Sequence, residues 1–206
     1  MEFLNYKAAV AELRPSGLVE IVEGAPADPD GNASDLVRFT LEPNSKGVKA
    51  VHSAAIGVSK ALSACADEVD GTTAISSAEP LAQLVEDVLH KHKVTEAMVI
   101  PVGKWRALCD LLAIELADDQ SWQDIDTEAS LHLNSRDPLL LTTRDFHILP
   151  KMLEALRRAT SDDATGAHDL SIVAAGVGLV LEFRPSGALL MIATNPSFCA
   201  ELAEMV

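Results

Sequence analysis

Apolar residues recur with the period of a β-strand near both ends of the chain. The segments 18–22 and 36–41 form one pair, and the segments 171–183 and 188–193 form another. The alternation is clearest at 36–41, where the odd-numbered positions are apolar and Arg38 is expected to face solvent. The sequence therefore predicts strands at both ends of the chain.

Between these strands the apolar residues recur every three or four positions, which is the period of an amphipathic helix. The most regular example is a predicted helix from about Val48 to Val69, spaced as in a coiled coil. Small residues on another of its faces would let a second helix approach closely, and ordinary packing within the monomer is the alternative. Its candidate interface residues are Val51, Ala55, Val58 and Leu62.

Shorter elements complete the middle and the end of the chain. An amphipathic helix is expected to begin near Leu81, and strands are expected at 97–102 and 139–141, each followed by a helix. Asn195 is expected to cap a C-terminal helix. The sequence thus predicts an α+β fold, with a mainly antiparallel sheet built from N- and C-terminal hairpins and packed against several helices from the middle of the chain.

The length of 206 residues suits a single α+β domain that spans 1–206. Three sub-units are expected within it. They are a hairpin plus the long helix at 1–70, two strand–helix units at 76–160, and a hairpin plus a helix at 170–206.

A short phrase that ends in Arg-Pro-Ser-Gly occurs at 12–17 and again at 182–187. Proline presets the first turn residue, serine suits the second, and glycine readily adopts the left-handed conformation that closes a three-residue loop. Each copy is followed by an apolar run. We therefore expect both copies to be the turns of β-hairpins.

The formal net charge of −15 is far from zero, and the chain has no basic tail or stripe. Nucleic acid and anionic membranes are therefore not expected partners. Acidity of this kind either keeps a protein soluble or forms a docking surface for a basic protein partner. The segment 110–128 favours docking, because it contains seven acidic residues and no Lys or Arg; a solvated helix end and loop would look the same.

The cysteines and the apolar runs bear on localisation. The first seven residues lack the pattern of a secretion signal, and the longest apolar run, at 170–181, is too short to cross a bilayer. The three cysteines are widely spaced and form no C-x-x-C pair. We therefore expect a cytoplasmic protein with free thiols.

Two histidines make the best candidate for a metal site. His90 and His92 are separated by one residue, and Glu86 lies one helical turn before His90. Because residues two apart on a helix point in different directions, the segment supplies at most two ligands, fewer than zinc needs. The alternative is a basic helix C-terminus. An acidic turn at 28–32 lacks the glycine and glutamate spacing of a calcium loop. No metal and no cofactor are therefore predicted.

An enzyme would need a site assembled from distant residues, because no nucleophile motif and no phosphate-binding loop is present. The candidates for such a site are His90, His92, Arg144, Asp145 and His147. Arg14 and Arg184 would form an anion site if the two hairpins lay side by side. The alternative is that each arginine pairs with the glutamate two positions before it.

Two functions remain open from the sequence. The first is a non-catalytic cytosolic interaction or regulatory module that acts as a homo-oligomer, most simply a homodimer. The predicted helix at 48–69 and the low aromatic content favour it. The second is an enzyme, or a protein that binds a small ligand or a metal. A cavity that holds two or more of the candidate side chains would favour the enzyme.

Overall fold

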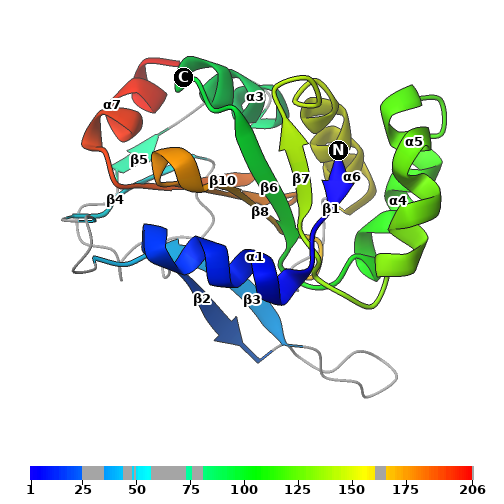
Figure 1. The fold of residues 1–206 in the computed structure, drawn as a ribbon. Helices are drawn as coiled ribbons and strands as arrows, with labels where there is room; N and C mark the ends of the chain where they lie inside the picture. The colour runs from blue at the N-terminus through cyan, green and yellow to red at the C-terminus, as the bar shows by residue number, and fades with distance from the viewer. Residues whose placement is uncertain are drawn as a thin grey trace.

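The computed structural model of the chain describes residues 1–24, 35–43, 48, 50–56, 73–75, 81–160 and 166–205. The fold is α+β, which confirms the sequence-based prediction (Figure 1). An eight-stranded sheet, here called the main sheet, is antiparallel throughout except for its last pair. In spatial order its strands are β1 (Glu2–Phe3), β7 (Leu139–Thr142), β6 (Glu96–Pro101), β8 (Leu170–Ala174), β9 (Leu179–Arg184), β10 (Ala188–Ala193), β4 (His52–Ile56) and β5 (Thr73–Ile75).

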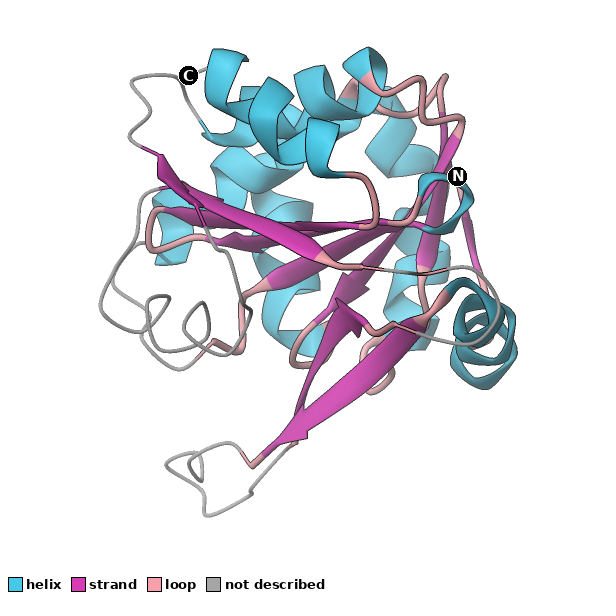
Figure 2. Ribbon diagram, turned by 90° about the vertical axis from the view of Figure 1, so that its left-hand side faces the viewer, coloured by secondary structure: helices cyan, strands magenta, loops and turns pink. Residues whose placement is uncertain are grey.

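The main sheet lies between two unequal layers, which Figure 2 shows from the side. One face is covered by helices that pack through a single large apolar core. These helices are α3 (Leu81–Lys91), α4 (Arg106–Glu115), α5 (Gln120–Ala129), α6 (Ile148–Thr160) and α7 (Pro196–Met205). The opposite face carries α1 (Tyr6–Leu13) and a two-stranded sheet, β2 (Leu18–Glu23) with β3 (Leu36–Leu41).

Both faces of the central strands are buried, which explains their continuous apolar sequences. Along β9, Leu179 and Leu181 pack toward the helices, whereas Val180 packs toward α1 and the β2–β3 hairpin. The helices bury one stripe each, as in α3, where Val85 and Val88 are fully buried. At the end of the chain the Asn195 side chain accepts a hydrogen bond from the Ser197 backbone N–H at 3.0 Å, as expected of a helix cap.

The prediction of one helix from Val48 to Val69 is wrong for the part of this segment that the structure describes. His52–Ile56 form β4, which pairs antiparallel with β10. Ala55 is fully buried in the sheet and Val51 is half-buried, while Val58 and Leu62 lie outside the described residues. Because both faces of β4 are covered, its small and apolar residues show no alternation, and spacings of three and four arise there by coincidence.

The repeated phrase forms a hairpin only in its second copy, at 182–187, which connects β9 with β10. The first copy, at 12–17, ends α1 instead, and a short 3-10 turn leads into β2. In both copies glycine takes a positive φ, 82° at Gly17 and 108° at Gly187. The residues before the phrase decide the outcome: Asn5 caps a run of good helix formers, whereas β9 is a run of strand formers.

The segment 171–183, predicted as one strand, is two antiparallel strands, β8 and β9. A short 3-10 turn, η3 (Ala175–Val177), joins them, and Gly178 follows it with a φ of 61°. Glycine has no Cβ, so it permits this reversal of the chain inside an apolar run. The turn therefore contains none of the polar residues that usually mark a turn in a sequence.

Replacing Gly178 with alanine is expected to destabilise the fold by roughly 2 kcal/mol, because a Cβ is strained at positive φ. That Cβ would also lie 2.5 Å from Thr194 Oγ1. Gly176→Ala is the matched control, since a Cβ there meets nothing within 4 Å. Urea denaturation measures both, and equal stabilities of the two variants would contradict this account of the turn.

Candidate functional site

A row of residues in cross-strand register crosses the face of the main sheet that is turned away from the large helix layer. Each member lies directly opposite the next on the neighbouring strand. From β1 to β4 the row is Glu2, Leu140, Met98, Val173, Val180, Ile192 and Ser53. Residues opposite one another in a sheet point to the same side, so these side chains form one continuous stripe.

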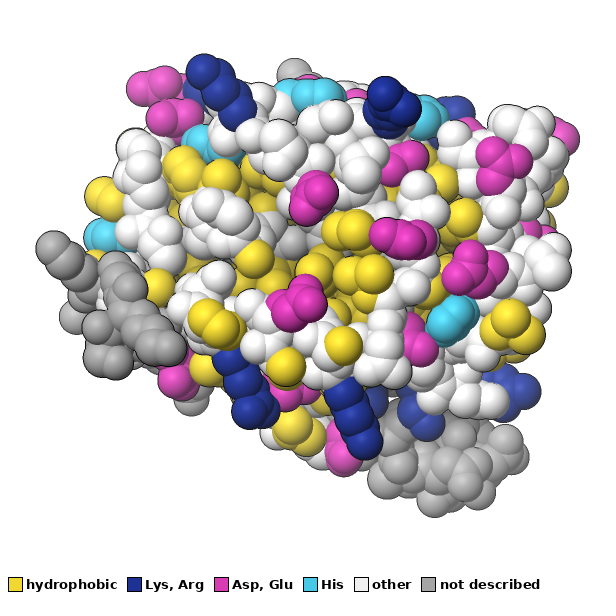
Figure 3. Space-filling model, viewed as in Figure 1, with side chains coloured by type: hydrophobic (Ala, Val, Ile, Leu, Met, Phe, Trp, Pro, Cys, Tyr) yellow, Lys and Arg dark blue, Asp and Glu magenta, His cyan; other side chains and the backbone are white. Residues whose placement is uncertain are grey.

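This stripe becomes more exposed toward β7. Val180 is fully buried and Ile192 is 5% exposed, because they belong to the core beneath α1 and the β2–β3 hairpin. Met98 and Leu140 are only half-buried, and Glu2 is exposed. In the space-filling view, apolar side chains gather in the middle of this face (Figure 3). The main sheet is thus left partly uncovered around β6 and β7.

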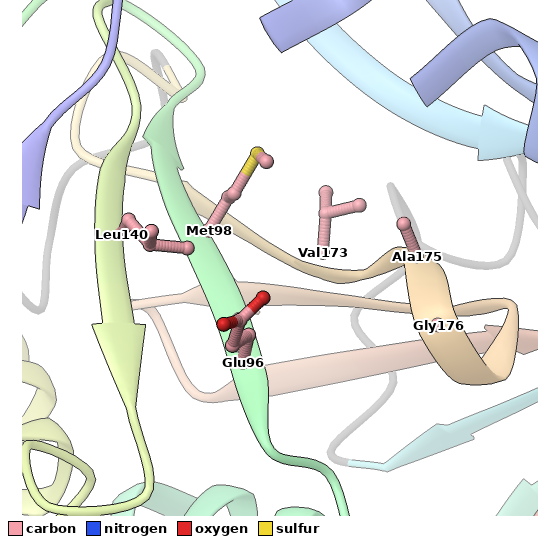
Figure 4. Close-up of a pocket in the computed structure, with 7 residues that line it drawn as sticks. Glu96, Met98, Leu140, Val173, Ala175 and Gly176 are labelled. Carbon is pink, nitrogen blue, oxygen red and sulfur yellow. The ribbon is translucent and has the colours of Figure 1, made fainter. Parts of the chain in front are cut away.

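A small cavity marks the uncovered part, with Glu96 and Met98 of β6 close to Leu140 of β7 and Val173 of β8 (Figure 4). Its volume is about 70 Å³. A second cavity of about 160 Å³ shares Glu96 and Gly176 with it. We call this surface the open sheet face and define it by Glu96, Met98, Leu140, Val173, Ala175 and Gly176.

The open sheet face is suited to contact with apolar side chains. Small-molecule sites usually enclose about 300–1,000 Å³, which is more than either cavity provides. Glu96 is the one ionisable residue among the described residues that line the first cavity. A shallow apolar surface with one carboxylate at its rim resembles a site for a protein segment more than a site for chemistry.

A buried group of charged residues lies between the β2–β3 hairpin and the main sheet. Arg38, predicted to face solvent, is instead 9% exposed. Its Nη1 donates to Glu182 at 2.5 Å and its Nη2 donates to Asp169 at 3.0 Å. Arg184 also donates to Glu182, at 2.8 Å. The prediction for Arg38 failed because the alternating pattern does not show that a second sheet covers its face.

We call this group of charged residues the ion cluster, and each of its charges affects the pKa values of its neighbours. The pKa of Asp169 is raised to about 6, because burial and the nearby Glu182 together outweigh the lowering effect of Arg38 and Arg184. Burial alone would lower the pKa of Arg38, but Glu182 and Asp169 raise it well above its usual value, so Arg38 stays charged. The ion cluster is therefore a structural contact that fixes the hairpin to the sheet.

The two candidate metal ligands do not converge. His90 is exposed and its Nε2 lies 3.3 Å from Glu86 Oε1. The His92 side chain is 3% exposed, and its ring packs against Phe198 of α7 with centroids 3.9 Å apart. Burial lowers the pKa of His92, although Glu201 opposes this shift. Within the described ranges, no group of three or more His, Cys, Asp or Glu side chains is placed to hold a metal ion.

The remaining enzyme candidates serve local structure. Asp145 accepts hydrogen bonds from the backbone and the hydroxyl of Thr142 at the end of β7. The His147 ring lies 2.9 Å from the Arg144 carbonyl oxygen and 3.2 Å from Ser121 Oγ. Among the described residues, no hydrogen bond or ion pair joins these side chains to His90 or His92, so the five candidates do not form one site.

The two arginines proposed as an anion site lie in different environments. Arg14 has an exposed side chain whose Nη2 is 3.9 Å from Glu20. Arg184 is buried and pairs with Glu182, two positions before it, which is the alternative that the sequence left open. The two hairpins expected from the repeated phrase are not formed side by side, so the sequence argument for an anion site no longer applies.

One polar pair in the structure was not predicted from the sequence. His132 Nδ1 lies 2.9 Å from Asp137 Oδ2, and Phe3 stacks on the imidazole with ring centroids 4.3 Å apart. Asp137 also accepts the Tyr6 backbone N–H at 2.8 Å, and its carbonyl accepts the Trp105 indole. These contacts tie β1 and α1 to the end of α5. A histidine and an aspartate five positions apart are too common to signal such a pair.

The acidic segment 110–128 forms the antiparallel helix pair α4 and α5, of which α5 was not predicted. Two of its acids are in ion pairs, Glu115 with Arg158 at 2.9 Å and Asp119 with Lys151 at 2.5 Å. The other five are exposed to solvent. Among the helices in the described part of the chain, none is long and apolar enough to cross a membrane.

Comparisons with protein-family models, with curated proteins and with solved structures gave no significant match to this chain.

Proposed function

We propose that this protein is a non-catalytic interaction module that binds a segment of another protein on the open sheet face. The observation that carries the proposal is the row from Val173 to Leu140, which is 1% exposed at Val173 and becomes half-buried at Met98 and Leu140. Apolar side chains that are only half-buried on β6 and β7, near one edge of the main sheet, are costly unless a partner covers them.

A second copy of the chain is the other possible occupant of this surface. The sequence favoured a homo-oligomer, but Val51 and Ala55 do not lie in a helix, and Val58 and Leu62 lie outside the described residues. Each copy carries a net charge of −15, so two copies repel each other. A partner of different composition therefore fits the charge better than a homodimer does.

A cytoplasmic location remains part of this proposal. Cys109 and Cys199 are free thiols, and Cys109 is buried. Burial, together with two nearby aspartates, raises the pKa of Cys109 to about 12, so the thiol stays protonated and unreactive. Free, inert thiols are compatible with a reducing compartment.

Selection of random displayed peptides on the immobilised protein tests the proposal. We expect clones that bind the wild type and lose binding to Met98→Asp, which places a charge in the apolar row. Gly176→Trp is a second blocking variant, because Gly176 is exposed and a Cβ there meets no neighbour within 4 Å. Gel filtration of each variant reports whether it remains folded and whether it is monomeric.

Three results would overturn the proposal. One is the absence of any enriched clone on the folded wild type. The second is a set of clones that bind wild type, Met98→Asp and Gly176→Trp equally. The third is a wild-type dimer that either blocking variant converts to a monomer, because the occupant would then be a second copy.

A further inference from the structure

We propose that the open sheet face recognises an apolar segment that carries a lysine or an arginine, and that this cation pairs with Glu96. The inference rests on the proposed function, because it names the class of segment that the same surface binds. It follows from the placement of Glu96, from the acid beside it, and from the charge of the chain as a whole.

Glu96 is a charged residue that borders the apolar row. It lies at the start of β6, two positions before Met98 and therefore on the same face. It is exposed, lines both cavities, and makes no ion pair or side-chain hydrogen bond with the residues described. Lys93 borders only the second cavity and is not paired with Glu96 in the described structure. Glu96 is thus available to an incoming cation.

A second carboxylate lies on the same face, further toward the edge of the main sheet. Glu2 is directly opposite Leu140 in the cross-strand row, and it is exposed. Like Glu96, Glu2 forms no ion pair with any of the residues that the structure describes. The apolar row is therefore followed by acidic groups on its open side, which favours a partner with apolar side chains next to a basic one.

Partial burial by a bound segment would strengthen such a pair. Charges interact more strongly as water is excluded around them, and a buried carboxylate without a partner is costly. A segment that covers Met98 and Leu140 also shields Glu96 from water. An acidic or neutral segment would leave that carboxylate unpaired, so the surface discriminates between segments by charge. The net charge of −15 adds long-range attraction for a basic segment.

A charge-swap selection tests this inference. Random displayed peptides are selected in parallel on the wild type, on Glu96→Lys, and on Asp87→Lys. Asp87 is an exposed residue of α3, which covers the opposite face of the main sheet, so its replacement gives the same net charge at a distant place. Only clones that lose binding to Gly176→Trp are counted, since these bind the open sheet face.

We expect the counted wild-type clones to be enriched in Lys and Arg relative to the unselected library. They should bind Glu96→Lys roughly tenfold or more weakly, and bind Asp87→Lys nearly as well as the wild type. Selection on Glu96→Lys should instead enrich Asp and Glu. High salt should weaken the wild-type clones.

The possible failures are distinguishable. If counted clones are found but show no preference for basic residues, or keep that preference on Glu96→Lys, the charge inference is wrong and the proposed function stands. If the weakening on Asp87→Lys equals that on Glu96→Lys, only the net charge of the protein acts, and the pairing with Glu96 is wrong. If no clone depends on Gly176, the proposed function itself fails.

Discussion

Replacing Arg38 with methionine is expected to lower the free energy of unfolding by about 3–5 kcal/mol, the usual cost of removing one partner from a buried ion pair. Asp169 and Glu182, which are 5% and 3% exposed, would face each other without the guanidinium between them. Methionine has a similar length and apolar stem, so the loss of charge is the main change. Urea denaturation at neutral pH measures the effect.

Arg14→Met is the matched control, because its side chain is 71% exposed and its contact with Glu20 is 3.9 Å long. Its loss should cost less than about 1 kcal/mol. A double replacement, Arg38→Met with Glu182→Gln, should cost less than the sum of the two single changes. Equal destabilisation by Arg38→Met and Arg14→Met would show that the ion cluster does not hold the hairpin.

The stability of the fold is expected to depend on the protonation of Asp169. Because burial raises the pKa of Asp169 in the folded state from 3.8 to about 6, the folded state binds this proton more tightly than the unfolded chain does. The contribution of Asp169 to stability is therefore fully present below pH 4 and is lost as the pH rises to about 6. A shift of this size corresponds to at most about 3 kcal/mol.

The measurement compares the wild type with Asp169→Asn by urea denaturation at several pH values. The difference in unfolding free energy, wild type minus variant, should increase as the pH falls from 7 to 4, because asparagine does not titrate. Asp124→Asn, at an exposed position of α5, is the control for replacing an aspartate with an asparagine outside the ion cluster. A difference that stays constant or shrinks for Asp169→Asn would contradict the raised pKa.

Elements whose partners lie nearby in the sequence could be predicted from it. The strand at 36–41, the helix that begins near Leu81 and the capped C-terminal helix all appear as expected, because period and capping are local signals. The hairpin at 182–187 appears for the same reason. The α+β class followed from the order of these elements.

The failures arise where tertiary packing overrides the local pattern. The segment His52–Ile56 is a strand because β10 is available to pair with it, which spacing alone does not reveal. The Arg-Pro-Ser-Gly phrase ends a helix at Gly17 and turns a hairpin at Gly187, according to what precedes it. Arg38 is buried because Asp169 and Glu182 are brought to it from more than a hundred residues away.

The open sheet face could not have been predicted from sequence. Leu140, Met98 and Val173 come from three strands, and only the register of those strands places them side by side. In the sequence, each of these residues lies in an apolar segment that is typical of a buried strand. How far each is exposed depends on how much of the main sheet α1 and the β2–β3 hairpin cover. The hydrophobic pattern of a strand does not show where this cover ends.

The most direct test of binding at the open sheet face is a titration of the protein, labelled with ¹³C at its methionine methyl groups, with a selected peptide. Met98 lies on the open sheet face, whereas Met152 and Met191 are fully buried in the core on the opposite side. We expect the Met98 signal to shift in proportion to bound peptide, while the signals of Met152 and Met191 stay in place. A peptide that binds without moving the Met98 signal would contradict the account.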